Sequence, residues 1–346
     1  MKNVKIMLYG VGAVGAMIGR FLLEKEGAEI VCAVDIAPDK VGKDLGDILG
    51  STRKLGVKIE NSVDSAAKHA KPDVAVHCTS SFLKDTCPQI ASIIEHGINV
   101  VSTCEELSYP YLTELKLAKQ LDTLAKKHDV TVLGTGINPG FLMDTLVIAL
   151  TAPCEKIEKI EAVRVMNAGT RRLPFQKKVG AGLTPNEFRN SIEQKKITGH
   201  VGLEQSIAMI SNALAIELDK ITAEQVEPVI AEENVQSKDI TVKKGNVAGL
   251  RQKAKGTMKG KEIITLDFQA YICAKVEYDE IRIRGEPPIN QKITPCVHGD
   301  KGTVAMIVNA IPKVINAPAG LVTMRDLPVP SAAIGNLGNH VVVSGR

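Results

Sequence analysis

The sequence predicts an α/β protein of two domains: a doubly wound parallel sheet first, then an α+β domain with an open, mostly antiparallel sheet. Up to about residue 150, short apolar runs of the kind found in buried strands alternate with segments of helical spacing. Beyond about residue 155, longer stretches alternate apolar and polar residues with a period of two. The length of 346 residues also exceeds one comfortable hydrophobic core.

The first domain is predicted over residues 1–150. Its expected strands are KIMLYG, EIVCAVD, KPDVAVHCT, INVVST and VTVLGTG, and its expected helices span about 13–25, 40–49, 84–96 and 111–128. Strands and helices that alternate in this way indicate a parallel sheet with helices on both faces.

The second domain, for substrate binding and dimerisation, is predicted over residues 151–300. Its strand-like stretches include KIEAVRVMNAG, EIITLDFQAYICAKV and YDEIRIRGEP, with one long amphipathic helix from about 202 to 218. A last helix is expected at about 302–314, followed by proline-rich coil. By analogy with similar folds, we expect this helix to pack back on the first domain.

Composition narrows the classes of function. Hydrophobic residues make up 44% and charged residues 24%, as in ordinary globular proteins. The net charge of +4 and the aromatic fraction of 3% give nucleic-acid binding little support. No apolar run approaches the ~20 residues that span a bilayer, so no membrane association is expected.

Two further features concern location and metals. The amino-terminal apolar run leads directly into a glycine pattern instead of a signal-peptide cleavage site, so a cytoplasmic protein is expected. The seven cysteines form no CxxC pair and no short His/Cys spacing. Neither a disulfide framework nor a metal site is therefore predicted.

The stretch LYGVGAVGAMIG carries Gly10-x-Gly12-x-x-Gly15 between a predicted strand and a predicted helix, which is the Rossmann dinucleotide-binding fingerprint. The glycines permit a tight turn and a close approach to a pyrophosphate, and the first helical turn with Ala13 and Val14 offers N–H groups to the anion. Asp35, twenty residues after Gly15, is expected to bind the adenine ribose. The cofactor is predicted to be NAD or NADP, with NAD favoured because a carboxylate repels a ribose phosphate, whereas Lys40 allows for NADP.

Other polar residues follow the later strands of this predicted sheet. Thr79 and Ser80 end the strand of KPDVAVHCT, where hydroxyls face the cofactor crevice of such sheets. Asn138 lies in the glycine-rich turn GTGINPG, and its amide could bind the nicotinamide carboxamide. These three residues are candidate cofactor contacts, although a solvated loop of small residues explains Thr79 or Ser80 equally well.

Two adjacent carboxylates, Glu105 and Glu106, follow the predicted strand INVVST. At the carboxyl edge of the sheet, one of them could act as a general base for water or hold an ammonium group, and a positioned base contributes ~10²–10⁴ in rate. Alternatively, both are acids at the start of the helix that follows, where they interact with its macrodipole. The sequence does not choose between the two glutamates.

Candidate substrate-binding residues come from both domains. In the first, they are Tyr109, Asn138 and Pro139, and in the second His200, which two glycines flank before the long helix. Arg251 and Lys253 are predicted to share one face of a strand, with Gln252 on the other, and one of the two cations could pair with a substrate carboxylate. A structural histidine and a solvated cationic strand face are the competing interpretations.

Longer motifs carry a resemblance to a known family. The segments STCEELSYP, GTGINPGFLMDTL, TGHVGLEQS, GLRQKAKG and HGDKGTVAMIVNAIPKVINAPAGLVTMRDLPVP resemble those of the 2,4-diaminopentanoate dehydrogenases of ornithine degradation and the related native amine dehydrogenases. The resemblance implies a dihydrodipicolinate-reductase-like architecture and a homodimer formed through the sheets of the second domain. It also implies an active-site glutamate, which matches Glu105 or Glu106.

The implied reaction is NAD(P)-dependent oxidative deamination of 2,4-diaminopentanoate to 2-amino-4-oxopentanoate and ammonia. Dihydrodipicolinate reductases carry a paired-histidine motif, and no His-His pair occurs in this chain. Two alternatives stay open: an amine dehydrogenase for simpler amines or a reductase of an imine or semialdehyde, and a non-catalytic NAD(P)H sensor.

Overall fold

The structure is a computed structural model that describes residues 3–68 and 70–342. It divides into two compact units. Unit 1 is built from two segments, up to Phe141 and from Gly299 onward, whereas unit 2 is the continuous segment Leu142–His298.

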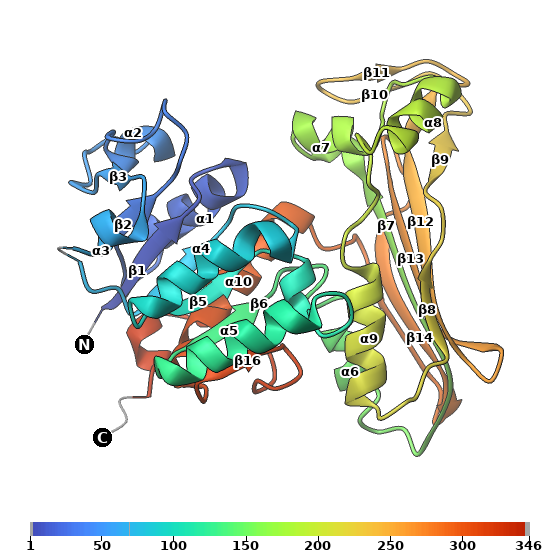
Figure 1. Ribbon diagram of the computed structural model, residues 1–346. Coiled ribbons are helices and arrows are strands. Elements are labelled where there is room, and N and C mark those ends of the chain that lie inside the picture. Colours follow the sequence, from blue (N-terminus) through green and yellow to red (C-terminus); the bar gives the residue numbers. More distant parts are fainter. Residues whose placement is uncertain (1–2, 69, 343–346) are drawn as a thin grey trace. The chain divides into compact units, whose positions relative to one another are not determined.

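Unit 1 contains a parallel sheet of seven strands in the order β16-β6-β5-β4-β1-β2-β3 (Figure 1). The strands are β1 Val4–Tyr9, β2 Ala28–Val34, β3 Ile59–Glu60, β4 Val74–His77, β5 Asn99–Ser102, β6 Thr131–Gly134 and β16 Gly320–Val322. The strand order reverses direction between β1 and β4, which confirms the predicted doubly wound sheet. In such sheets the ligand crevice opens at this switch point, beyond the carboxyl ends of the strands.

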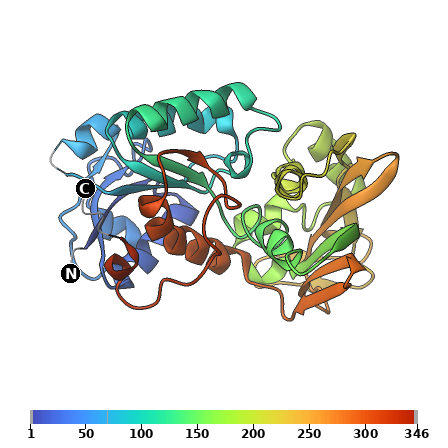
Figure 2. The ribbon, with the colours of Figure 1, turned by 90° about the horizontal axis from the view of Figure 1, so that it is seen from below.

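Helices cover both faces of this sheet, as buried parallel strands require. They are α1 Ala13–Glu24, α2 Leu45–Leu49, α3 Val63–Ala67, α4 Leu83–Glu95, α5 Leu115–Lys127 and α10 Gly299–Asn316, with short 3₁₀ turns η1 Glu106–Ser108 and η3 Leu337–His340. Figure 2 shows α10 on the opposite face of the sheet from α5. Side chains of α4 and α5 share one core cluster with Met7, Val34 and Val100.

Several elements of unit 1 differ from the prediction, and two of them, β3 and α3, were not predicted at all. The helix expected at 40–49 begins only at Leu45, after Asp44 caps it by accepting a hydrogen bond from the Gly46 N–H. The helix expected from residue 111 begins at Leu115. The coil expected after the last helix contains β16, which extends the sheet beyond β6. A strand of three residues is too short to show a period of two, so the sequence pattern did not indicate it.

Unit 2 is built around a mixed sheet in the order β15-β14-β7-β13-β12-β8, with β9 also paired to β12. Its strands are β7 Lys156–Asn167, β8 Lys220–Ala223, β9 Glu227–Ile230, β12 Val247–Met258, β13 Lys261–Tyr271, β14 Tyr278–Glu286 and β15 Ile289–Ile293, beside a small ribbon of β10 Val235–Gln236 and β11 Thr241–Val242. Its helices are α6 Thr145–Leu150, α7 Leu173–Lys178, α8 Pro185–Glu193 and α9 Leu203–Ala213, with the 3₁₀ turn η2 Ala168–Thr170. Only β7 and β13 pair in parallel among these neighbours, so the open, mostly antiparallel sheet is confirmed.

The two faces of the second sheet differ in what covers them. Helix α9 packs on the face that bears Gln252 and Gly256, where a Cβ on Gly256 would lie 3.0 Å from Ile207 of α9. We call this the inner face; Figure 1 shows α9 along it. Because successive side chains of a strand alternate, Arg251 and Lys253 belong to the opposite, outer face. The helix predicted over 202–218 ends at Ala213, shortly before Ala215 takes a positive φ of 52°.

Four directly opposed residues cross the inner face: Gln252, Phe268, Arg164 and Asp279. We call them the cross-strand row. Arg164 is 1% exposed, and its Nη1 donates to Asp279 Oδ1 at 2.7 Å. The other oxygen of Asp279 accepts the Val297 N–H at 2.8 Å, while Arg164 Nη2 donates to the Val297 carbonyl. Burial raises the pKa of Asp279 against the attraction of Arg164, so the pair depends on these hydrogen bonds to stay ionised.

Breaking this buried pair should destabilise unit 2. We predict that Asp279→Asn lowers the free energy of unfolding by about 3–5 kcal/mol, because it leaves the guanidinium buried without a counter-ion. Urea denaturation followed by circular dichroism measures the loss. The matched control is Lys156→Met: Lys156 and Glu158 pair with side chains 69% and 46% exposed, and the loss of such an exposed pair should change the free energy of unfolding little. Equal losses for both variants would contradict a special role for the buried pair.

Candidate active site

The glycine loop after β1 has the geometry that a dinucleotide requires. Gly10 has φ +88°, and a Cβ there would lie 2.4 Å from the Cys78 carbonyl oxygen. A Cβ on Gly15 would lie 1.9 Å from the Gly10 carbonyl oxygen, so helix α1 and the turn pack as closely as the fingerprint predicts. Around Gly12, in contrast, nothing lies within 4 Å of the Cβ position. The chain therefore leaves open space at the glycine that should face a pyrophosphate.

The amino terminus of α1 is ready to bind an anion. Gly12 is its N-cap residue, no side chain caps it, and its first turn holds no acidic residue. The first turn contains Ala13 and Val14, two of the predicted cofactor contacts. Their N–H groups and the positive end of the helix dipole favour a phosphate here.

Asp35 ends β2 beside this loop and is buried. Its carboxylate accepts hydrogen bonds from the Val11 N–H at 2.8 Å, the Ala37 N–H at 2.9 Å and Lys40 Nζ at 3.0 Å. Burial alone would raise the pKa of Asp35, but the hydrogen bonds from Ala37, Lys40 and Val11 together hold it below its ordinary value. The ionised Asp35 thus fixes the glycine loop, and Lys40 is paired with Asp35.

Beyond β4, Thr79 and Ser80 lie at the predicted edge but already make contacts within unit 1. Thr79 Oγ1 donates to Gln89 Oε1 at 2.7 Å, and Ser80 Oγ donates to Asp85 Oδ2 at 2.8 Å, both on α4. Thr79 is exposed and Ser80 half-buried, so both remain accessible at the carboxyl edge of the sheet. The structure brings them close to the carboxyl end of β1, through the contact of Gly10 with Cys78 and Thr79.

A buried histidine that the sequence analysis did not select organises this edge. His77 is 0% exposed, with Nδ1 2.9 Å from Ser102 Oγ and Nε2 2.8 Å from Gln89 Oε1. Ser102 Oγ in turn accepts the Cys104 N–H at 3.1 Å. This network therefore ties the ends of β4 and β5 to helix α4.

The proton positions in this network follow from its chemistry. Burial lowers the pKa of His77 to about 4, so the ring is neutral at neutral pH. Because Gln89 Oε1 only accepts, Nε2 carries the proton; Nδ1 then accepts from the Ser102 hydroxyl. Every donor in the chain from Cys104 to Thr79 thus has an acceptor.

The two glutamates after β5 have different surroundings. Glu106 Oε2 accepts the N–H of Leu83, the first residue of α4, at 2.7 Å. The acid that interacts with a helix dipole is therefore Glu106, and the helix is α4, not the α5 that follows it in the chain. Glu105 is half-buried, is the N-cap residue of η1, and accepts two hydrogen bonds from Ser108 at its carbonyl.

The loop that bears Glu105 and Glu106, which we call the acidic loop, packs against β6. A Cβ on Gly134, the last residue of β6, would lie 2.5 Å from the Leu107 carbonyl carbon, so only glycine permits this approach. Beyond Gly134 the chain turns sharply through Asn138 and Pro139, which are joined by a cis peptide bond. The loops that bear Glu105 and Asn138 are therefore neighbours at the carboxyl edge of unit 1.

Tyr109 packs inside unit 1. It is 8% exposed and meets the ring of Tyr111 edge to face at 5.4 Å. Burial raises the pKa of its hydroxyl. The charge of Arg325 lowers this pKa, and the charge of Asp326 raises it. Its surroundings are those of a core residue below the acidic loop.

The three candidates from unit 2 do not lie together. The His200 ring stacks on Phe268 of the inner face, with centroids 4.2 Å apart and an interplanar angle of 7°. Arg251 and Lys253 lie on the outer face, where Arg251 Nε donates to Asp267 Oδ1 at 2.9 Å. The sheet thus separates His200 from the two cations with which the sequence analysis grouped it.

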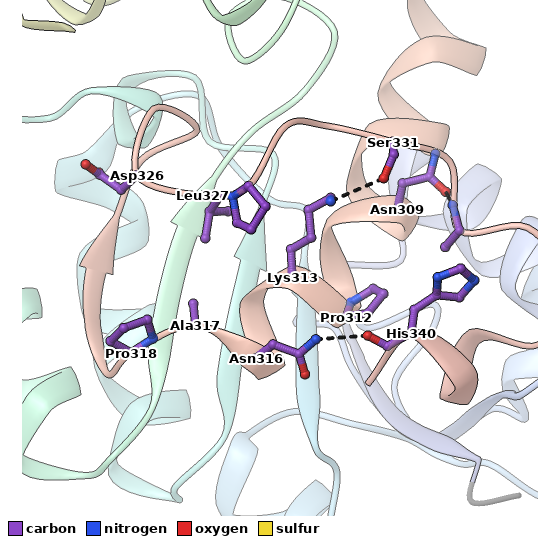
Figure 3. A pocket seen from close by; sticks show the side chains of 12 residues that line it. Asn309, Pro312, Lys313, Asn316, Ala317, Pro318, Asp326, Leu327, Ser331 and His340 are labelled. Carbon is purple, nitrogen blue, oxygen red and sulfur yellow. Dashed lines mark hydrogen bonds between the residues drawn. The ribbon is translucent and has the colours of Figure 1, made fainter. Parts of the chain in front are cut away.

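The hollow in Figure 3 lies at the amino ends of the strands of unit 1, opposite to the carboxyl edge where the cofactor is expected. It has a volume of about 300 Å³ and is lined by the second half of α10 and the chain that follows, with Lys313 Nζ donating to Ser331. It includes Ala317 and Pro318, whose carbonyls accept from Thr131 at the amino end of β6. Ligand crevices of such sheets open at the carboxyl ends.

Among residues 3–68 and 70–342, no cluster of three or more His, Cys, Asp or Glu side chains is arranged to hold a metal ion. Within the same residues, no helix has the length and apolarity needed to cross a membrane.

Comparison with known proteins agrees with this geometry. Residues 141–343 match the family model of the 2,4-diaminopentanoate dehydrogenase C-terminal domain, and residues 4–135 match that of the dihydrodipicolinate reductase N-terminus. The chain is 37% identical to 2,4-diaminopentanoate dehydrogenase of Acetoanaerobium sticklandii, over 97% of this chain and 96% of that protein.

Amine dehydrogenases are also similar over the whole length. That of Streptomyces virginiae is 23% identical over 97% of this chain and 99% of its own. The solved structure of amine dehydrogenase from Mycobacterium smegmatis superposes with a TM-score of 0.83 and 27% identity, covering 96% of this chain and 98% of that one.

The His77 network should make the protein acid-sensitive. Because the pKa of His77 falls from 6.5 to about 4 on folding, the unfolded chain binds a proton that the folded chain does not between these values. The free energy of unfolding should therefore decline by up to ~1.4 kcal/mol per pH unit as the pH falls from 6.5 to 4. His77→Gln should remove this part of the slope, as measured by urea denaturation across that range. An unchanged slope would mean that His77 does not titrate with folding.

Proposed function

The chain belongs to the 2,4-diaminopentanoate dehydrogenase family, and from this premise we propose that it catalyses the NAD(P)-dependent oxidative deamination of 2,4-diaminopentanoate. The products are 2-amino-4-oxopentanoate and ammonia. The observation that carries the proposal is 37% identity along 97% of the chain to a protein of that activity. Such an enzyme is an oxidoreductase acting on CH–NH₂ groups.

The cofactor of the proposal is a nicotinamide dinucleotide bound at the glycine loop. Support comes from the open space at Gly12, the uncapped amino terminus of α1, and Asp35 at the end of β2. We propose NAD as the preferred form because the ionised Asp35 repels a ribose 2′-phosphate. Lys40 offsets that charge at 3.0 Å, which would permit slower use of NADP.

Glu105 is the proposed acid–base residue. The carboxylate of Glu106 holds the amino terminus of α4, so its loss of charge would disturb the helix first. Glu105 lies half-buried in the loop beside β6, at the edge where a nicotinamide binds in sheets of this type. A carboxylate here takes a proton from the substrate ammonium, which frees the nitrogen lone pair.

The reaction balances with one water molecule. When bound, the oxidised nicotinamide supplies the hydride acceptor for the hydrogen of C4. After passing that first proton to solvent, Glu105 assists water to attack the resulting iminium carbon. The C–N bond then breaks, and the nitrogen leaves as ammonium while the ketone forms. Two electrons leave the substrate in this sequence, and a proton is released to solvent through the glutamate.

A simpler amine as substrate is the second candidate. It is favoured by the TM-score of 0.83 with an amine dehydrogenase that matches 98% of its own length. The homodimer, the cytoplasmic location and the place in ornithine degradation expected from the sequence and its resemblance stay predictions.

Turnover by the purified protein tests the function. We expect reduction of NAD, and more slowly of NADP, with 2,4-diaminopentanoate, followed by the absorbance of the reduced nicotinamide. Ornithine and 2-aminopentane serve as comparison amines and should react at least tenfold more slowly. Reaction with 2-aminopentane at an equal or higher rate would instead establish the simpler amine dehydrogenase.

Separate substitution of the two glutamates tests their roles. Glu105→Gln should lower kcat about 100-fold or more with little change in stability, because it removes the base but keeps the shape. Glu106→Gln should lower the free energy of unfolding by about 1 kcal/mol and reduce kcat less than tenfold, since it weakens a helix cap. Each variant is the control for the other, and the reverse pattern would assign catalysis to Glu106.

A further inference from the structure

The His77 network joins two places in unit 1 where the proposed reaction needs fixed groups. We use this name for the hydrogen-bonded side chains of Thr79, Gln89, His77 and Ser102 together with the N–H group of Cys104. One end is Thr79, a candidate cofactor contact, and the other end is the start of the acidic loop. His77 lies between them and is 0% exposed, so it can act on a ligand only through its neighbours.

At the first end, the network fixes the direction of the Thr79 hydroxyl. Thr79 Oγ1 donates its one proton to Gln89 Oε1 at 2.7 Å and lies 3.1 Å from His77 Nε2. Gln89 Oε1 also lies 2.8 Å from His77 Nε2, so the three atoms form a closed triangle. Because its proton is committed to Gln89, Thr79 Oγ1 offers a cofactor only its lone pairs. The partner that fits is a donor, such as a ribose hydroxyl or a carboxamide N–H.

This end of the network also touches the glycine loop. A Cβ on Gly10 would lie 2.9 Å from Thr79 Cγ2, so Thr79 packs directly against the first turn of the loop. The ring of Tyr9, the residue before Gly10, lies with its centroid 5.1 Å from that of His77. Thr79 is therefore held beside the loop that is proposed to bind the dinucleotide, with its side chain exposed.

At the second end, the network fixes the start of the acidic loop. His77 Nδ1 lies 2.9 Å from Ser102 Oγ, which accepts the Cys104 N–H at 3.1 Å. The carbonyl of His77 accepts the Thr103 N–H at 3.0 Å. Cys104 directly precedes Glu105 in the chain. The position of the proposed acid–base residue thus depends on a bond that His77 supports.

We propose that His77 is a positioning residue that couples the cofactor contact of Thr79 to the placement of Glu105. The inference rests on the proposed function, because it assigns to His77 the alignment of the base with the nicotinamide. Nε2 holds Thr79 through Gln89, and Nδ1 holds the acidic loop through Ser102. A neutral imidazole has its donor and its acceptor on opposite sides of the ring and serves both ends at once. The amide of Asn or Gln carries both groups on one carbon, so it reaches only one of the two positions.

Two substitutions at His77 separate the ends. An Asn amide lies as many bonds from the backbone as Nδ1, and a Gln amide as many as Nε2. His77→Asn therefore keeps the acceptor for Ser102 but loses the bond to Gln89. Its Kd for NADH, measured by the fluorescence of the bound nicotinamide, should rise about fivefold or more, with kcat at saturating cofactor reduced less than about threefold. His77→Gln should show the reverse: kcat with 2,4-diaminopentanoate falls about tenfold, and the Kd for NADH stays within about twofold.

Variants at the ends of the network repeat the comparison and serve if the His77 variants do not fold. Thr79→Val removes an exposed hydroxyl and should raise the Kd for NADH at least as much as His77→Asn. The double variant should bind NADH no more weakly than Thr79→Val alone, because both changes act on one interaction. Ser102→Ala should lower kcat as His77→Gln does.

The matched control removes a buried hydrogen bond elsewhere in unit 1. Thr131 is 1% exposed, and its hydroxyl donates to two backbone carbonyls at the amino end of β6, away from the network. Thr131→Val should therefore change neither kcat nor the Kd for NADH by more than about twofold, even where it lowers the stability.

A readout that needs no turnover separates this proposal from the proposed function. Hydrogen–deuterium exchange of the peptide 103–108 reports on the acidic loop. Exchange there should be at least about fivefold faster in His77→Gln and Ser102→Ala, and unchanged in His77→Asn and Thr79→Val. A wild type that binds NADH and shows this pattern without oxidising 2,4-diaminopentanoate would end the proposed function and leave the coupling through His77 standing.

Several results would overturn the proposal. Equal changes of kcat and Kd in His77→Asn and His77→Gln would assign His77 a general structural role, as would losses of the same size in Thr131→Val. Additive effects of His77→Asn and Thr79→Val would mean that the two residues act independently. An unchanged Kd for NADH in Thr79→Val, or no binding of NADH by the wild type, would remove Thr79 from the cofactor site.

Discussion

The buried ion pair of Arg164 and Asp279 is the interaction on which unit 2 depends. A guanidinium that is 1% exposed is costly to bury, and the cost is offset only because Asp279 and the Val297 carbonyl satisfy its donors. The pair joins β7 to β14 and also holds Val297, two residues before α10 begins. The same contacts therefore fix the sheet, the floor under His200 and the point from which the chain leaves the unit.

Unit 1 depends in the same way on the hydrogen bonds of a few polar side chains at the carboxyl edge of its sheet. Asp35 orders the glycine loop, His77 joins β4 to β5, and Glu106 caps α4. Each of these side chains satisfies backbone or hydroxyl groups that the strand ends leave without partners. These hydrogen bonds form without any ligand, and a site that is organised in advance holds a cofactor at low entropic cost.

Local patterns predicted the fold and the cofactor loop, because each depends on residues close in sequence. Gly10, Gly15 and Asp35 lie where the fingerprint predicts them, since one strand, turn and helix position all three. The acidic loop was also predicted, but the different surroundings of Glu105 and Glu106 were not. The N–H group of Leu83, which distinguishes them, comes from a helix more than twenty residues earlier.

The surroundings of the candidate residues in unit 2 were predicted less well, for a related reason. Alternation along β12 correctly gave Arg251 and Lys253 one face and Gln252 the other, yet nothing local says which face α9 covers. The sequence GTRRLPF suggests a solvated cationic turn, whereas Arg171 is buried in the structure. Phe175 and Met166 are among its contacts, and only the folded sheet brings Met166 near it.

Unit 1 is built from two segments that are separated in the sequence by the whole of unit 2, and this affects the order in which its parts are made on the ribosome. Strand β16 and helix α10, which complete its sheet and one of its faces, are translated after the whole of unit 2. The roughly 180 residues between Phe141 and Val322 take on the order of 10 to 40 s to make at typical elongation rates. During that interval the edge of β6 is an open template for pairing with other chains. Unit 2, which is continuous in sequence, can complete its sheet first, whereas unit 1 completes its own only after β16 has been made.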